Sequence, residues 1–216
     1  MKKLSVFLVI LSLLIFINTK SWALSFVLST VDYSADQTME TGNMKMNSKV
    51  YYTPNKMRME QEFSGMQQIM INRFDKHLVW TLMPQMKSYN ETQIKPQDLP
   101  TEHNPNVKVE QTVVGKETIN GLETTKTKIT VTNNDGSKFE GFFWGTKDKI
   151  QVKMEGSALD KNGKTVNMKI TLTNIKIAPQ DPKLFEIPEG YVNASSGGGN
   201  GSNINVQEML KNMKKR

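Results

Sequence analysis

The sequence has 216 residues, no cysteine and a formal net charge of +7. The lack of cysteine excludes disulfides, thiol catalysis and thiolate metal sites. The charge is too mild to favour a nucleic-acid partner, because three of the lysines lie in the first 20 residues and the others alternate with acidic residues.

Residues 1–23 have the pattern of a cleaved export signal. Two lysines precede an apolar run over residues 4–17, and residues 21–23 read Ser-Trp-Ala, a small-x-small cleavage site. The run is shorter than the about 20 residues that a membrane-spanning helix needs, although an uncleaved anchor is an alternative. Because Leu24 offers no thiol to a lipid, we predict a free periplasmic protein, cleaved after Ala23, with release from the cell as the alternative.

Residues 24–192 predict one all-β domain, a curled antiparallel sheet or unclosed half-barrel of about ten strands. Short alternating runs are separated by turn signals, and a sheet of this size curls or splits into layers. The turns are predicted at residues 53–56, 120–121, 135–136 and 162–163. The predicted strands are residues 26–33, 44–52, 56–63, 66–74, 77–83, 86–92, 107–119, 123–132, 138–144, 149–156 and 165–177.

Side chains alternate between the two faces of a strand, so each run has an apolar and a polar side. We expect the apolar sides to share the concave face and to line a site for a hydrophobic or amphiphilic ligand, such as a lipid or an acyl chain. In the run from Phe142 to Trp144, at least one large ring must leave the core unless both faces are covered. The predicted lining residues are Met57, Met59, Ile69, Ile71, Trp80, Leu82, Phe142, Trp144, Met154 and Met168.

Several motifs in order along the chain resemble an uncharacterised family of bacterial secreted proteins. They are Lys-Met-Arg-Met-Glu at residues 56–60, Arg-Phe-Asp-Lys at 73–76, Gly-Lys-Glu-Thr-Ile-Asn-Gly at 115–121 and Leu-Phe-Glu-Ile-Pro-Glu-Gly-Tyr at 184–191. That family is similar to the outer-membrane lipoprotein carrier (lipoprotein localisation factor) superfamily. The resemblance implies an unclosed antiparallel barrel with a lid over an apolar cavity for acyl chains, and residues 95–106, which are polar and irregular, are the candidate lid.

No pattern predicts catalysis, a metal centre or a cofactor. The carboxylates of Glu60 and Glu62, next to Arg58, are typical of a solvated charge ladder. His77 and His103 lie in predicted loops without a nucleophile motif. The methionines favour an adaptable apolar lining, and the alternative is a soft Cu(I) site built from Met44, Met46, Met57 and Met59.

The C-terminus predicts a flexible linker over residues 193–203 and a basic amphipathic helix over residues 204–216. Apolar side chains recur at helical spacing from Val206 to Met213, and lysines and an arginine follow them. A helix this short is marginal alone in water, so we expect it to dock on the sheet, on an anionic membrane surface or on an envelope protein, or else to remain a disordered tail. An interaction module that uses exposed aromatics and this tail is the alternative function.

Overall fold

The computed structural model describes residues 28–63, 65–94, 107–134, 136–159 and 163–194. They form a single sheet of twelve strands with two short 3-10 helices, so the predicted mainly-β fold is confirmed, with one strand more than the eleven predicted ranges. The helices are η2 (Pro84–Met86) and η4 (Pro182–Phe185). The strands are β1 (Tyr33–Thr41), β2 (Met44–Thr53), β3 (Lys56–Phe63), β4 (Met66–Arg73), β5 (Leu78–Met83), β6 (Ser88–Gln93), β7 (Val107–Ile119), β8 (Leu122–Asn133), β9 (Lys138–Gly145), β10 (Gln151–Leu159), β11 (Thr165–Ile177) and β12 (Val192–Asn193).

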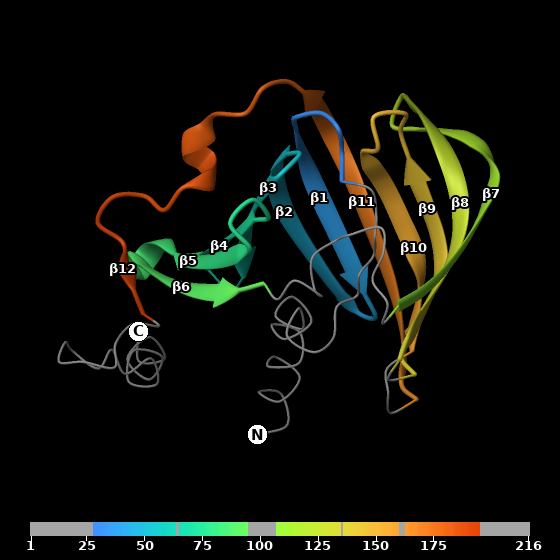
Figure 1. Cartoon of the computed structure of the whole chain (residues 1–216), viewed down its shortest axis with the longest axis horizontal. Coiled ribbons are helices and arrows are strands. Elements are labelled where there is room, and N and C mark those ends of the chain that lie inside the picture. The colour runs from blue at the N-terminus through green and yellow to red at the C-terminus, as the bar shows by residue number, and fades with distance from the viewer. Residues whose placement is uncertain (1–27, 64, 95–106, 135, 160–162, 195–216) are drawn as a thin grey trace.

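The sheet consists of two meanders joined side by side (Figure 1). Strands β1 to β6 pair in sequence on one side, and β7 to β11 pair in sequence on the other. The two halves join where β11 pairs antiparallel with β1. After β11 the chain crosses back to the far side, where β12 pairs parallel with β6. The sheet is therefore unclosed, with β7 at one end and β12 at the other.

The predicted turns fall where strands meet. Asn120 and Gly121 have φ angles of 50° and 80°, which a two-residue hairpin turn with the twist of its strands requires. Thr53 pairs with Lys56 across the proline turn. Gly136 and Gly163 also have positive φ, while their partners at 135 and 162 lie outside the described residues.

The prediction of a first strand over residues 26–33 is wrong. Residues 28–32 form no strand, and β1 starts at Tyr33 and continues to Thr41. The sequence of β1 contains Met39 as its only large aliphatic side chain, so its alternation is weak. Pairing with β2 on one edge and with β11 on the other stabilises it as a central strand.

A pair of glycines shows toward which face the sheet bends. Gly141 in β9 lies opposite Gly156 in β10. A Cβ on Gly141 would collide with the backbone of Glu155 and Gly156, so the neighbouring strand folds toward that side. The ring of Phe139 lies against both positions. We call the face on which these two Cβ atoms would point the concave face and the other the convex face.

Both faces contain a hydrophobic core. Three buried clusters lie on the concave face, centred on Tyr52, on Met59 and on Phe139. The fourth lies on the convex face of β4 and β5, where residues 178–194, which we call the strap, cross the sheet on their way to β12. Phe185 of the strap is only 1% exposed, so the chain covers this part of its convex face itself.

Candidate functional site

The structure divides the ten predicted lining residues between the two faces. Strand pairing places Arg58 opposite Ile71 and Ile71 opposite Trp80, so the apolar rows of β4 and β5 share a face with the charged row of β3. The expectation that all ten share the concave face is therefore wrong. On the concave face lie Met57, Met59, Met154 and Met168; on the convex face lie Ile69, Ile71, Trp80, Leu82, Phe142 and Trp144.

The convex row of β4 and β5 is buried by the strap. Ile71 and Leu82 are fully buried, and Trp80 is 6% exposed, in one cluster with Phe185. Trp80 therefore belongs to the core and not to an accessible lining. Its indole Nε1 donates to Glu91 at 2.8 Å, which satisfies the ring's polar atom.

Two buried arginines fasten the strap to the sheet. Arg58 donates to the carbonyl oxygen of Leu184 at 2.9 Å and pairs with Glu60 at 2.7 Å. Arg73, 3% exposed, pairs with Asp75 at 2.7 Å and with Glu186 at 2.6 Å. The predicted solvated ladder is thus wrong at Arg58, which the strap covers.

The same contacts perturb ionisation. The hydrogen bond from Arg73 lowers the pKa of Asp75 below its usual range, and that bond raises the pKa of Arg73. Both groups therefore remain charged at neutral pH, and their attraction ties the β4–β5 turn to the strap.

Phe142 and Trp144 lie on the convex side of β9, away from the strap. Trp144 is 1% exposed, and its Nε1 donates to Glu117 at 2.7 Å. The ammonium groups of Lys126 and Lys153 lie 4.8 Å and 4.2 Å from the centroid of its ring, a cation–π arrangement. Phe143 points to the concave face, where it is buried. Both faces of this aromatic run are therefore covered.

Methionine is the most distinctive residue type of the concave face. Every methionine in a described strand points to it, as the register of β1 to β5, β10 and β11 shows. A polarisable, unbranched side chain adapts to different apolar partners. These residues are Met39, Met44, Met46, Met57, Met59, Met66, Met70, Met83, Met154 and Met168.

Four of these methionines form a continuous, half-buried surface, which we call the methionine patch: Met39, Met44, Met46 and Met168. Met39 lies opposite Met46 on β2. Thr41 lies between the other two, opposite Met44 on one side and Met168 on the other. All four are partly exposed, whereas Met59, Met70 and Met154 are buried. The patch is thus a contiguous accessible part of the methionine face, and Met57, Met66 and Met83 on β3, β4 and β5 are also at least partly exposed.

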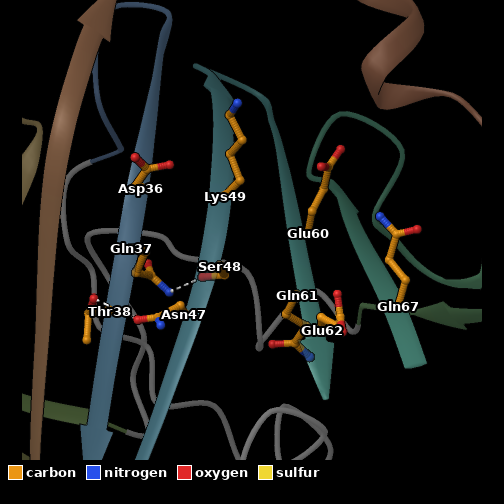
Figure 2. A pocket seen from close by; sticks show the side chains of 10 residues that line it. All are labelled: Asp36, Gln37, Thr38, Asn47, Ser48, Lys49, Glu60, Gln61, Glu62 and Gln67. Carbon is orange, nitrogen blue, oxygen red and sulfur yellow. Dashed lines mark hydrogen bonds between the residues drawn. The ribbon is translucent and has the colours of Figure 1, made fainter. Parts of the chain in front are cut away.

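A polar hollow adjoins the patch, since Gln37 and Ser48 of its lining are the next concave-side residues after Met39 and Met46. Figure 2 shows the side chains that line it. Strands β2 and β3 pair only as far as Ser48 and Gln61, although both strands continue. The opening has a volume of about 370 Å³. It is not the apolar cavity that the sequence predicts, since all its lining side chains are polar: Asp36, Gln37, Thr38, Asn47, Ser48, Lys49, Glu60, Gln61, Glu62 and Gln67.

Three of these side chains, from Gln37, Ser48 and Gln61, point to the concave face next to the patch. Gln37 Nε2 donates to Ser48 Oγ at 3.3 Å, and Gln61 Nε2 donates to Gln68 at 2.6 Å. The buried Oε1 of Gln61 has no hydrogen-bond partner among the described residues. A buried oxygen without a partner is costly, so this atom is a candidate acceptor for a ligand hydroxyl or amine.

The opposite end of the concave face is filled. Tyr33 and Tyr52 stack with ring centroids 5.2 Å apart. The turn between β7 and β8 reaches over to them, and Asn120 Nδ2 donates to the carbonyl oxygen of Leu172 at 2.7 Å. Burial raises the pKa of Tyr33 to about 12 and raises the pKa of Tyr52 as well, so both hydroxyls are neutral at physiological pH.

Some sequence predictions fall on parts of the chain that the structure does not describe. These are the export signal, the candidate lid, His103 and the tail helix. The predicted linker starts too early, because Asn193 belongs to β12 and the N–H of Ala194 donates to Tyr89 at 2.8 Å. His77 lies in the β4–β5 turn, as predicted.

Among the described residues no helix has the length and apolarity to cross a membrane. Within that same part of the chain, no three His, Asp or Glu side chains come together as metal ligands.

The sequence model of one family, described as a domain of unknown function (DUF4412), matches residues 34–156. The chain belongs to this family. The matched region of the DUF4412 domain starts in β1 and ends in β10, so it contains the glycine pair and three of the four patch methionines. Met168 and the strap follow it. The predicted membership of an uncharacterised family is thereby confirmed, and no curated protein matches the chain significantly.

Solved structures with a similar arrangement were also found for this DUF4412 protein. An uncharacterized conserved protein from Thermus thermophilus is 14% identical with a TM-score of 0.48, and the match covers 76% of this chain and 91% of that one. MucB, in the MucA/MucB complex of Pseudomonas aeruginosa, is 13% identical with a TM-score of 0.47, covering 75% and 58%. The LolA superfamily protein NE2245 from Nitrosomonas europaea is 10% identical with a TM-score of 0.38, covering 73% and 90%.

Sequence reasoning missed Met39 as a site residue. Gln37, Met39 and Thr41 point to the same face of the strand. Because the two neighbours of Met39 are polar, the alternation predicts no apolar row there. The available signal was the pair Met44 and Met46 on the next strand, which the sequence places on one face and the structure sets beside Met39.

Proposed function

We propose that this protein binds an amphiphile non-enzymatically, with the apolar chain on the methionine patch and the polar head in the hollow between β2 and β3. The observation that supports this most is the contact between the two surfaces. Gln37 and Met39 are successive concave-side residues of β1, and Ser48 and Met46 are successive concave-side residues of β2. A molecule lying along these strands would meet both.

The chemistry of the two surfaces suits the two parts of such a ligand. Each buried methylene of an acyl chain contributes about 0.8 kcal/mol, so a chain several carbons long supplies affinity without directed polar contacts. Methionine adapts to chains of different length and saturation. In the hollow, Gln61 Oε1 offers an acceptor next to the concave-side amide of Gln37, which suits a head that carries hydroxyl or amine groups.

The proposal is tested by equilibrium binding of a fluorescent fatty acid, with displacement by palmitate and by lysophosphatidylethanolamine. Met39→Lys should weaken binding roughly tenfold, since a charge on the patch removes the burial of about two methylenes. Asn167→Lys is the matched control, because Asn167 is adjacent to Met168 of the patch, is exposed, points to the convex face and does not line the hollow. Equal affinities of the two variants, or no binding by the unmodified protein, would contradict the proposal.

A second candidate is binding of a soft cation. Met39 lies opposite Met46, and Met59 lies opposite Met70, so thioethers are paired across strands. Such sulfurs are ligands for Cu(I). The double variant Met39→Leu/Met46→Leu keeps the apolar volume but removes two sulfurs. Loss of Cu(I) affinity with retained fatty-acid binding would favour the metal, and unchanged Cu(I) titration would exclude this site.

We place this activity in the periplasm, on the pattern of residues 1–23, and the tail over residues 204–216 is the proposed contact with a membrane surface or an envelope protein. Cell fractionation with N-terminal sequencing checks the location. The expected mature protein begins at Leu24 in the periplasmic fraction, and an unprocessed cytoplasmic chain would contradict it.

A further inference from the structure

Strand β7 forms the long free edge of the sheet. The strand order ends there, so one edge of its backbone pairs with β8 and, among the described residues, no strand pairs with the other edge. It runs for 13 residues, whereas β12 at the opposite end of the sheet has 2. An unpaired edge of this length presents N–H and C=O groups that can accept another strand.

Apolar side chains are concentrated on this edge. Val109, Val113 and Val114 are 37%, 67% and 55% exposed, and they are half of the large apolar side chains exposed in the described part of the chain. Val109 and Val113 point to the concave face, opposite Val131 and Thr127 of β8. An added strand would cover them.

The order of residues along β7 makes the edge complementary to itself. We propose that two copies of the protein pair antiparallel through their β7 edges, in a register centred on Gln111. In this register Val109 of each copy lies opposite Val113 of the other, twice, on the concave side. Glu110 lies opposite Thr112 on the convex side, so no like charges face each other.

Other registers fit less well. The irregularity between Val113 and Gly115 makes Val114 an extra residue in β7, so a register centred on Val113 would place two bulges together. In a register centred on Val109, no residue of the partner copy's β7 would lie opposite Val113. Lys108 and Lys116 lie just outside the segment from Val109 to Val113 that pairs in the proposed register, and charged residues at the ends of an edge disfavour pairing beyond it.

Pairing through β7 is symmetric, so it joins two copies and does not continue to a third. A two-fold axis through Gln111 uses the long edge of both copies, so the joined sheet ends at the shorter strands β6, of six residues, and β12, of two. Such an isologous contact yields a dimer and not a fibre. The inference does not depend on the ligand of the methionine patch.

The test is sedimentation velocity over a wide concentration series. The protein should form dimers reversibly, and Val109→Lys or Val113→Glu alone should weaken the dimer roughly tenfold, because a charge then faces an apolar side chain at both symmetry-related pairs. The double variant Val109→Lys/Val113→Glu should restore dimerisation, since opposite charges of the two copies then face each other.

Val192→Lys is the matched control, an equally exposed valine (66%) on the short edge, and should leave the dimer unchanged. A monomeric wild type at every concentration would overturn the inference. So would a dimer that neither single variant weakens, or a double variant that dimerises no better than the singles.

Discussion

The two faces of this sheet are both apolar but are covered differently. On the convex side of β4 and β5, the strap lays Phe185 on Ile71 and Leu82, and buried arginines bind its carbonyl groups. On the concave side at β1, β2 and β11, the methionine patch remains half-exposed. The comparison teaches that rigid, branched and aromatic side chains occur where the chain supplies its own cover, and that flexible methionines occur where it does not.

The largest loss of stability is expected on the covered convex face, at the centre of the strap. Phe185→Ala should lower the free energy of unfolding by about 3–5 kcal/mol, because a fully buried ring is removed and a cavity is left. Urea denaturation measures the change. Val192→Ala, an exposed residue of the same strap, is the control and should be nearly neutral. A loss below about 1 kcal/mol for Phe185→Ala would mean that the strap does not seal this face.

The concave bend is tested at the glycine pair. Gly141→Ala should cost about 1–3 kcal/mol or more, because the added methyl group meets the backbone of β10. Gly145→Ala in the same strand is the matched control, since nothing lies within 4 Å of its Cβ position. Equal stability of the two variants in thermal denaturation would contradict the bend described for β9 and β10.

The arginine contacts of the strap give a pH-dependent prediction. Arg73→Met should cost about 1–3 kcal/mol at neutral pH, through the loss of charged hydrogen bonds. The pKa of Asp75 is lowered in the folded state, so its contribution is complete above its ordinary value of about 3.9 and disappears as the pH falls through the lowered value.

The stability difference between wild type and Arg73→Met should therefore shrink on acidification in that range. Lys76→Met is the control, because Lys76 is half-exposed and 3.8 Å from Glu186. A difference that stays constant with pH would show that the Asp75 pair adds nothing to the strap.

The smallest effect on stability is expected at the methionine patch. Met39→Ala should change the free energy of unfolding by about 1 kcal/mol or less, since its side chain is partly exposed. Met70→Ala, on the same face but 5% exposed, should cost about 2–5 kcal/mol. Similar losses in chemical denaturation would mean that the patch belongs to the core.

The period-two pattern was sufficient to predict the sheet, its turns and most strand positions, because alternation and turn chemistry are local. It could not predict which faces of different strands coincide. Met59 and Trp80 each lie on the apolar side of their own strand, yet the pairing of β3, β4 and β5 places them on opposite faces. The strap causes this ambiguity: once Phe185 covers the convex side, apolar rows are favourable on both faces.

The site was only partly predictable for the same reason. Met168 was expected in the lining, but the concave-side neighbours of Met39 in its own strand, Gln37 and Thr41, are polar. The hollow between β2 and β3 depends on where two strands stop pairing, and no residue of either strand signals that separation in the sequence.

The most direct test of the central claim is methyl NMR of the protein labelled at methionine Cε, titrated with palmitate and with lysophosphatidylethanolamine. The account predicts saturable shifts of the methyl signals of Met39, Met44, Met46 and Met168, with little change at Met70 and Met154. Signals that do not respond to either amphiphile, or a response confined to methionines outside the patch, would contradict it.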